Sequence, residues 1–242
     1  MFGSTITVII PAFNEEKTIG YVISDTAEIL TALNLPYEII VVNDGSTDKT
    51  LSIASEHKIK ILSNQQNKGK GYSLRKALRI AQGDIIVTLD SDGEHKPKEI
   101  PDLLAALDED TDVVSGSRFL RGQSHVTTRV NQIGNLFFNV AIMVLTGKEI
   151  SDSQTGFRVA RRRVLEKLNL ESDGFEIESE IAVKSLAMGF NFKEMPITIE
   201  RRKYSISKLK IAKDGTRILS IILKSAISSF ESPKKRGKYF EV

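Results

Sequence analysis

The chain has 242 residues, 40% of them hydrophobic, which is enough to bury the core of one α/β domain with a short appendage. The 34 Lys and Arg residues nearly balance the 31 Asp and Glu residues, and a net charge of +3 gives no reason to expect a nucleic acid partner. Cysteine is absent, which excludes disulfides and thiolate chemistry and is typical of a cytoplasmic protein. The start has no signal-peptide pattern, and the longest apolar stretch, 136–145, is too short to cross a bilayer, so we expect a soluble or peripheral protein.

Strands and helices are predicted to alternate along the first half of the chain. Short apolar or β-branched runs predict buried strands at 5–13, 37–42, 59–62, 85–89 and 112–115. Apolar residues at helical spacing predict helices at 14–33, between the Lys68–Gly71 segment and Gly83, and at 97–107. This order predicts an α/β fold with a mostly parallel central sheet and helices on both faces.

The acidic turn Asp90-Ser91-Asp92-Gly93-Glu94-His95 follows the predicted strand 85–89 directly. In open α/β sheets, ligands bind at the carboxyl ends of the strands. Two carboxylates one residue apart repel each other unless a cation lies between them, and a hard divalent cation with phosphate co-ligands fits such a pair. We therefore predict a metal and phosphate site here, against the alternative of a solvated acidic turn.

Two common nucleotide-binding loops are excluded. A dinucleotide-binding turn needs G-x-G-x-x-G after the first strand, where this chain has Pro-Ala-Phe-Asn-Glu-Glu. A Walker loop needs G-x-x-x-x-G-K-[ST], which the segment 68–72 does not match.

Motifs in both halves of the chain together resemble one enzyme family. The first half carries, in this order, Ile9-Ile10-Pro11-Ala12-Phe13-Asn14-Glu15-Glu16, Val42-Asn43-Asp44-Gly45-Ser46-Thr47-Asp48, Asn67-Lys68-Gly69-Lys70-Gly71 and Asp90-Ser91-Asp92-Gly93. They resemble the family 2 glycosyltransferases, which have a GT-A fold. The second half carries Val114-Ser115-Gly116-Ser117-Arg118, Ser151-Asp152-Ser153-Gln154-Thr155-Gly156-Phe157-Arg158, and Arg202, Tyr204 and Ser207-Lys208-Leu209. These are similar to dolichol-phosphate sugar synthases, which make polyprenyl-phosphate mannose or glucose from nucleotide sugars.

The resemblance implies a role for each matching residue. The donor nucleotide would be held by Pro11, Glu15, Asp44, Lys68 and Asp92. Mg²⁺ or Mn²⁺ would be bound by Asp90 and Asp92, with Glu94 as a third-ligand candidate. The acceptor phosphate would be clamped by Arg118, Arg129, Arg202 and Lys208. The residues expected to take part in catalysis are then Asp90, Asp92, Asp152 and Arg118.

The resemblance implies an inverting, metal-dependent transfer of a hexose or N-acetylhexosamine from a GDP- or UDP-linked donor to dolichyl or polyprenyl phosphate. A phosphate acceptor is already ionised, so it needs cations to place it rather than a strong general base. Two other functions stay open. One is transfer to a soluble or glycan hydroxyl, because the serine that the family has after Arg129 is missing and Glu176, Glu178 and Glu180 offer general bases. The other is a non-catalytic nucleotide-sugar binder.

Several charged residues have two interpretations. In one interpretation Asp152 faces the sugar or acceptor and Arg158 braces the active-site carboxylates. In the other, the two form a buried Asp–Arg pair that fixes a loop. Glu176 and Glu180 share a helix face, and at least one of them is expected in solvent. A lone His beside a turn, such as His95, is more often structural or solvated than a ligand.

The end of the chain predicts an appendage to the catalytic domain. We expect a GT-A domain at 1–212, an amphipathic helix at 213–231 and a basic, flexible tail at 232–242. The helix has an apolar stripe that suits core or dimer packing, or a helix lying on anionic lipid because the basic tail follows it. Peripheral attachment to the cytoplasmic face of a membrane is therefore expected, and the oligomeric state cannot be read from the sequence.

Overall fold

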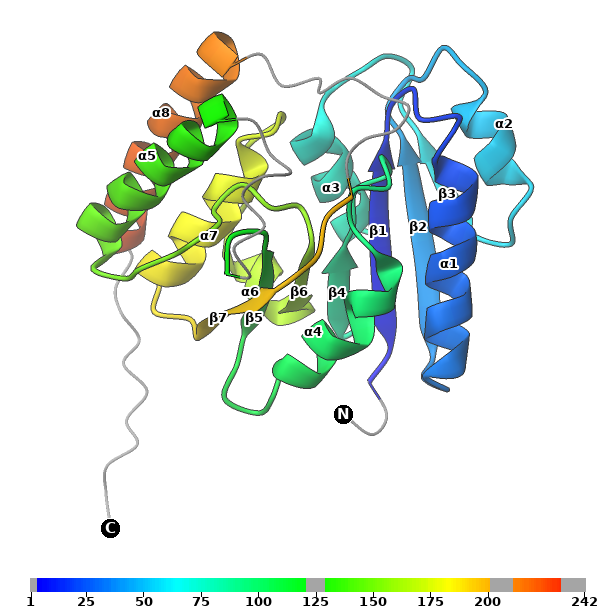
Figure 1. Cartoon of the computed structure of the whole chain (residues 1–242), viewed down its shortest axis with the longest axis horizontal. Coiled ribbons are helices and arrows are strands. Elements are labelled where there is room, and N and C mark those ends of the chain that lie inside the picture. The colour runs from blue at the N-terminus through cyan, green and yellow to red at the C-terminus, as the bar shows by residue number, and fades with distance from the viewer. Residues whose placement is uncertain (1–3, 121–128, 201–210, 232–242) are drawn as a thin grey trace.

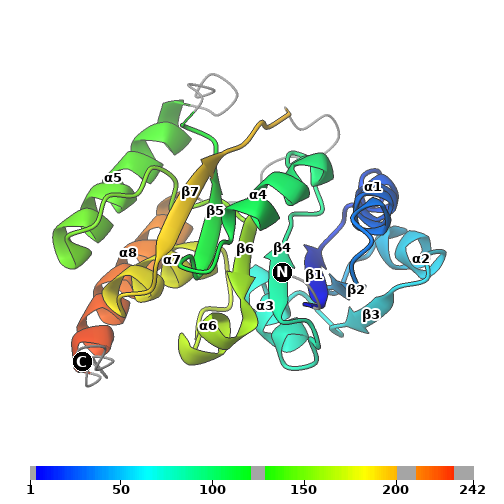
Figure 2. The ribbon, with the colours of Figure 1, turned by 90° about the horizontal axis from the view of Figure 1, so that it is seen from below.

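The computed structural model of the protein describes residues 4–120, 129–200 and 211–231 (Figure 1). A single central sheet lies between two layers of helices, and a pair of long helices lies beyond one end of the sheet (Figures 1 and 2). The predicted α/β class is confirmed.

Seven strands form the sheet within the described residues, in the order β3-β2-β1-β4-β6-β5-β7. Their bounds are β1 Ile6–Ala12, β2 Tyr37–Asn43, β3 Lys60–Ser63, β4 Ile85–Thr88, β5 Val113–Ser117, β6 Arg158–Arg161 and β7 Phe192–Pro196. All pairings are parallel except those of β6 with β4 and with β5. The five predicted strands are all present, and β6 and β7 complete the sheet. The predicted mostly parallel sheet is confirmed.

The helices cover both faces of the sheet. Apolar side chains of α1 (Ile19–Ala32), α2 (Thr50–Ser55) and α4 (Ile100–Ala106), which follows the 3-10 turn η1 (Pro97–Glu99), pack on one face. The other face is covered by α3 (Lys70–Leu78), α6 (Arg162–Lys167) and α7 (Ile177–Ala187). Because the alternate residues Ile9 and Ile10 of β1 belong to these two different clusters, the near-continuous apolar strands are explained by burial on both faces.

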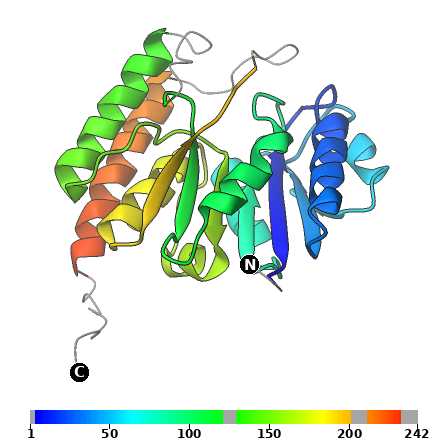
Figure 3. The same ribbon diagram turned by 60° about the horizontal axis from the view of Figure 1, so that its bottom comes forward.

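The two long helices form an outer layer with α7. Phe138 and Ile142 of α5 (Arg129–Thr146) join Ile218 and Ile222 of α8 (Ile211–Glu231) in a third apolar cluster that includes α7 (Figure 3). Of the apolar stripe expected on 213–231, Ile222 and Ala226 are buried, as its packing interpretation predicts, whereas Leu223 is 45% exposed. Ile218, outside that stripe, is buried as well. None of the described helices is long and apolar enough to cross a membrane.

The first helix begins later than the sequence indicates. The sequence predicts a helix that begins at Asn14, whereas α1 begins at Ile19. Asn14 has a left-handed backbone, with a φ of 52°. The N–H groups of residues 14–16 donate to side chains of the loop after β2, which holds this segment as a turn.

Candidate active site

The loops after β1 and β2 interlock at the carboxyl end of the sheet. The backbone N–H groups of residues 14, 15 and 16 donate to Ser46 Oγ, Thr50 Oγ1 and Asp48 Oδ2 at 3.0, 2.8 and 3.1 Å. In return, the amide oxygen of Asn14 accepts the N–H of Thr47 at 2.8 Å. The first two motifs are therefore one structural unit.

Asp44 holds the next loop in place. Its buried carboxylate accepts hydrogen bonds from Asn64 Nδ2 at 2.7 Å and from the backbone N–H groups of Lys68 and Gly69 at 2.9 and 2.8 Å. Since a carboxylate offers about four lone-pair sites, one acceptor position is left for a ligand. The side chain of Lys68 is exposed. Asp44 thus fixes the loop that carries Lys68, and both residues are expected at the nucleotide from the family resemblance.

The acidic turn leaves β4 where the sequence places it. Asp92 Oδ1 accepts the backbone N–H of Glu94 at 3.0 Å, which closes the turn around Gly93. Gly93 has a φ of 75°, and a Cβ there would collide with the Tyr21 hydroxyl, so the position requires glycine. Asp90 and Asp92 are both partly exposed. The turn presents hard oxygen ligands at the sheet edge.

A partly buried lysine neutralises Asp90. The ammonium of Lys70, at the start of α3, contacts Asp90 Oδ1 and lies 2.8 Å from Glu178 Oε1. Burial lowers the pKa of Lys70, but Asp90 and Glu178 raise it more, and the net shift is upward. Gly156 lies against this pair, since a Cβ there would be 2.6 Å from Asp90 Oδ2. The sequence analysis gives Lys70 no role, because it assigns the other lysine of the same motif, Lys68, to the nucleotide.

A second buried cation continues this network. Arg158 Nη1 donates to Glu178 Oε2 at 2.5 Å, and Arg158 Nε donates to Ser115 Oγ at 3.2 Å. Burial lowers the pKa of Arg158 despite the raising effect of Glu178. Arg158 thus braces Glu178 on α7, and through Lys70 it braces Asp90. The expectation that Arg158 pairs with Asp152 is not met, because Asp152 has another partner.

Asp152, which is buried, and Arg118, which is partly buried, form another ion pair of the site. Arg118 Nε and Nη2 donate to the two carboxylate oxygens of Asp152 at 2.7 and 2.8 Å, and the backbone N–H of Arg118 adds a third bond at 3.1 Å. Burial lowers the pKa of Arg118, but Asp152 raises it more, with Glu94 and Asp90 adding to the rise. Asp152 is wholly buried and holds Arg118 through both carboxylate oxygens, whereas a contact of Asp152 with the sugar or acceptor stays a prediction.

The comparisons with known proteins decide the family. The model of the family described as Glycosyl transferase family 2 matches residues 7–169, more than half of the chain. The chain belongs to glycosyltransferase family 2. The interlocked loops, the Asp90 turn and the Arg118–Asp152 pair therefore lie in a glycosyltransferase.

Three curated relatives of this glycosyltransferase are similar over most of its length. An uncharacterised protein of Methanocaldococcus jannaschii is 33% identical over 88% of this chain and 89% of its own. A dolichyl-phosphate hexose transferase of Haloferax volcanii is 29% identical over 81% of this chain and 83% of its own. A dolichol-phosphate mannosyltransferase of Pyrococcus furiosus is 29% identical over 85% of this chain, which spans only 59% of that enzyme.

Solved structures show the same fold. A glucosyl-3-phosphoglycerate synthase of Mycobacterium tuberculosis, solved with Mn²⁺, UDP-glucose and phosphoglyceric acid, superposes with a TM-score of 0.73. It is 24% identical to this glycosyltransferase over 93% of the chain and 80% of its own. The predicted GT-A fold is confirmed by this likeness.

The predicted site residues fall into three groups. Those at the carboxyl end of β1, β2, β3 and β4 or in the loops that follow are Pro11, Glu15, Asp44, Lys68, Asp90, Asp92 and Glu94. Arg118 and Asp152 form a pair, whereas Arg129 is exposed at the first residue of α5. Arg202 and Lys208 lie outside the described residues. The specific role of each residue stays a prediction.

The acidic 176–180 segment is more buried than expected. Glu176, Glu178 and Glu180 are all buried, so the solvated interpretation is wrong for each of them. Glu178 pairs with Arg158, and Glu180 pairs with Lys184 at 2.6 Å. Segment 176–180 therefore supports the loops of the site.

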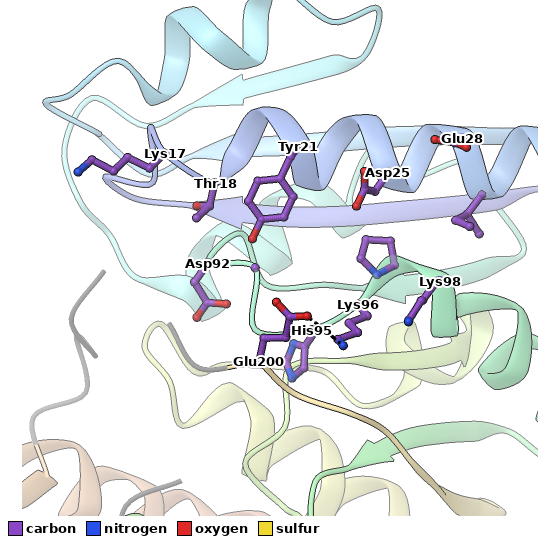
Figure 4. Close-up of a pocket in the computed structure, with 13 residues that line it drawn as sticks. Lys17, Thr18, Tyr21, Asp25, Glu28, Asp92, His95, Lys96, Lys98 and Glu200 are labelled. Atoms are coloured by element: carbon purple, nitrogen blue, oxygen red, sulfur yellow. Dashed lines mark ion pairs between the residues drawn. The ribbon is translucent and has the colours of Figure 1, made fainter. Parts of the chain in front are cut away.

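A cavity of about 660 Å³ adjoins Asp92 on the side of α1 (Figure 4). Tyr21 points from α1 toward the acidic turn, and Lys96 and Glu200, which both line the cavity, form an ion pair at 3.0 Å. Burial raises the pKa of Tyr21, and the charge of Asp92 adds to it. Of the residues expected to hold the nucleotide, Asp92 lines this cavity, whereas Asp44 and Lys68 do not.

His95 lies at the base of the acidic turn and is buried. Its ring packs against Phe157 with 5.5 Å between centroids, and Nδ1 is 3.7 Å from Asp90 Oδ2. Neither ring nitrogen has a hydrogen-bond partner among the described residues. The structural interpretation of this histidine fits its burial.

The side chains of the acidic turn provide part of a ligand set for a divalent metal. Asp90 and Asp92 offer hard carboxylate oxygens, and Asp90 already contacts a cation, the Lys70 ammonium. Within the described residues, no three His, Asp or Glu side chains gather into a metal-binding group. The protein would therefore supply Asp90 and Asp92, and the remaining ligands would come from the diphosphate and water. Glu94 as a third ligand stays a prediction.

Proposed function

We propose that this glycosyltransferase is a metal-dependent, inverting enzyme that moves a hexose or N-acetylhexosamine from a GDP- or UDP-linked donor to dolichyl or another polyprenyl phosphate. The relatives named for dolichyl-phosphate transfer support the acceptor class. Since that acceptor is lipidic, the protein would work as a peripheral protein on the cytoplasmic face of a membrane.

One observation supports the choice of acceptor: three carboxylates of the site, those of Asp90, Asp152 and Glu178, are engaged in ion pairs. Asp152 accepts three hydrogen bonds from Arg118, and Glu178 contacts Arg158 and Lys70. A carboxylate held by a guanidinium is a weak base, because losing the pair on protonation costs free energy. Such a site suits an acceptor that is already ionised, such as a phosphate, better than a hydroxyl that must be deprotonated.

Each part of the chain has a role in this proposal. The interlocked loops with Pro11, Glu15 and Asp44 would hold the nucleoside, and Asp90 and Asp92 would hold Mg²⁺ or Mn²⁺. When bound, that ion would neutralise charge developing on the leaving diphosphate. Arg118, fixed in orientation by Asp152, would present its remaining N–H groups to the acceptor phosphate. The acceptor oxygen would attack C1 of the sugar as the bond from C1 to the diphosphate breaks.

Nucleotide binding tests the donor side first. We would titrate GDP and UDP calorimetrically with and without Mn²⁺, expecting metal-dependent binding of one of them. The matching sugar nucleotides would then be assayed with a polyprenyl phosphate and, as the matched control, with the same polyprenol lacking its phosphate.

The two acceptors separate the functions. Transfer to the phosphate alone supports the proposal, whereas transfer to the free polyprenol or to neither acceptor contradicts it. Transfer to a soluble hydroxyl instead would move the assignment to that alternative. If neither GDP nor UDP binds, with or without Mn²⁺, the protein has a glycosyltransferase fold without this activity.

A further inference from the structure

The buried side of helix α5 carries two amides. The buried side chains of this helix are Asn135, Phe138, Asn139 and Ile142, and their spacing of three and four residues places them on one side. Phe138 and Ile142 pack in the apolar cluster that α5 shares with α7 and α8. A buried amide does not add to such packing, because it costs free energy unless its polar atoms are hydrogen-bonded. The two asparagines therefore serve another purpose than attaching the helix.

Both asparagines bind the two residues that flank Asp152. Asn139 Nδ2 donates to the backbone oxygen of Ser151 at 2.7 Å, and Asn139 Oδ1 accepts the backbone N–H of Ser153 at 3.1 Å. Asn135 Nδ2 donates to the same oxygen of Ser151 at 3.2 Å, and its Oδ1 accepts the hydroxyl of Ser153 at 3.4 Å. Asp152 thus lies between two residues that α5 holds.

Strands β6 and β7 fix the rest of this loop. Glu194 of β7 accepts the backbone N–H groups of Ser151 and Asp152 at 2.8 and 3.0 Å. Arg158 of β6 donates through Nη2 to the backbone oxygen of Ser153 at 3.2 Å. The backbone N–H groups of all three loop residues are therefore hydrogen-bonded. A satisfied polar network of this kind favours one position of the loop over others.

The loop passes this constraint on to Arg118. The carboxylate of Asp152 accepts hydrogen bonds from Arg118 Nε, Nη2 and the backbone N–H at 2.7, 2.8 and 3.1 Å. The side chain of Arg118 is 17% exposed, so part of it is accessible to a ligand. A displacement of the loop would therefore move a guanidinium that reaches the surface of the site.

We propose that Asn139, supported by Asn135, is a positioning residue for Arg118, so that helix α5 sets where the guanidinium meets the acceptor phosphate. The acceptor part rests on the proposed function, in which Arg118 binds that phosphate. A guanidinium binds phosphate through N–H groups of fixed geometry, so a displaced Arg118 binds it less well. The positioning itself concerns hydrogen bonds within the protein and is measured without turnover.

NMR of the full chain tests whether α5 holds Arg118. The readout is the rate at which the Nε–H of Arg118, which donates to Asp152, exchanges with solvent, and its signal is identified by its loss in Arg118→Lys. Asn139→Leu removes both bonds of the amide to the loop. We expect the exchange to become at least about tenfold faster than in the wild type. This acceleration should exceed that of the backbone amides of the central strand β1, which report global unfolding.

Ile222→Ala is the matched control. Ile222 is buried in the apolar cluster that α8 shares with α5, so the variant weakens the packing of α5 and keeps both amides. Relative to the β1 amides, its Arg118 Nε–H should exchange at the wild-type rate. Equal relative rates in Asn139→Leu and in this control would overturn the inference. If Asn139→Leu does not fold, Asn139→Ala, which inserts no larger side chain, decides in the same way.

Turnover separates this inference from the proposed function. With polyprenyl phosphate and the sugar nucleotide identified by the GDP and UDP titrations, Asn139→Leu should raise the KM for the phosphate at least about tenfold and leave nucleotide affinity as in Ile222→Ala. Faster exchange with an unchanged KM would contradict the acceptor part and leave α5 as the element that positions Arg118. If no protein transfers sugar to the phosphate, the proposed acceptor fails, and the exchange rates alone decide whether Asn139 positions Arg118.

Discussion

The ammonium of Lys70 contacts a carboxylate oxygen of Asp90 and lies 2.8 Å from Glu178. A partly buried cation thus holds the carboxylate that the sequence analysis assigns to a divalent metal. Glu178 is held in turn by Arg158 at 2.5 Å. Two cations and two anions alternate along this network, so each charge is compensated by its neighbours.

Removal of the Lys70 charge should destabilise the fold. In Lys70→Met, Asp90 and Glu178 keep their charges without the shared ammonium, and loss of one partner from a buried pair costs about 3 kcal/mol in the free energy of unfolding. Mn²⁺ should raise the melting temperature of this variant more than that of the wild type, because the ion would supply the missing positive charge at Asp90. Thermal unfolding with and without Mn²⁺ measures both effects.

Lys68→Met is the control for this prediction. Lys68 is exposed, and its backbone N–H, which the substitution keeps, makes the hydrogen bond to Asp44. Its stability should change by no more than about 0.5 kcal/mol. A Lys70→Met protein as stable as this control, with no extra response to Mn²⁺, would contradict the role of Lys70 as the counter-charge of Asp90.

Asp92→Asn should separate donor binding from folding. The asparagine keeps an Oδ1 acceptor for the N–H of Glu94, so the turn is preserved, while the negative charge of a proposed metal ligand is lost. We expect the wild-type unfolding midpoint and a loss of at least about tenfold in Mn²⁺-dependent nucleotide affinity by calorimetry. The same change at the exposed Asp102 should leave both quantities unaltered. Unchanged nucleotide affinity in Asp92→Asn would remove Asp92 from the metal site.

The fold of the first half of the chain can be predicted from the sequence because the signals there are local. A buried strand is a run of β-branched residues, and the acidic turn follows its strand without interruption, as at Ile85–Asp92. The order of the motifs then implies their meeting at one sheet edge, since parallel strands end on the same side.

Residues that meet across long sequence distances were not predictable in this way. The partner of Asp152 is Arg118 rather than Arg158, and only the antiparallel strand β6 explains why. This strand places Arg158 inside the protein, beside Glu178 and away from Asp152. A four-residue strand with two arginines at its ends has no apolar run to reveal it.

The two apolar segments of the second half show another limit of sequence patterns. Both 133–146 and 216–230 are amphipathic, so pattern alone cannot tell which apolar side is buried. In the structure, Ile218 and Ile222 of α8 are buried, whereas Ile133 and Val144 of α5 face outward. The choice depends on how α7 packs between them and the sheet, which is a property of the whole fold.

Arg118 and Asp152 should behave as a coupled pair. Arg118→Met leaves the wholly buried Asp152 charge unpaired, which should cost about 3–5 kcal/mol in the free energy of unfolding. The double variant Arg118→Met/Asp152→Asn removes the orphan charge and should recover at least about 1 kcal/mol of that loss. Urea unfolding of the two single variants, the double variant and the wild type measures the coupling. Additive losses would show that the two side chains do not act as a pair.

Asp48 should make the interlocked loops sensitive to acid. Burial raises the pKa of Asp48, but hydrogen bonds from Thr50 and from the N–H of Glu16 lower it more, and the net shift is below the usual 3.8. As the pH falls, the unfolded chain therefore binds a proton at this carboxyl before the folded protein does. The stabilisation from Asp48 is complete above the unfolded pKa and is lost as the pH falls through the lower, folded pKa.

Asp48→Asn tests this direction. The variant should be less stable than the wild type at pH 7, because an amide accepts the N–H of Glu16 more weakly than a carboxylate does. The difference in unfolding free energy should shrink between about pH 5 and pH 2, where the wild type alone loses the charge. Urea unfolding across this pH range measures the difference, with Asp102→Asn as the exposed control. A constant difference at all pH values would show that the charge of Asp48 does not hold the two loops together.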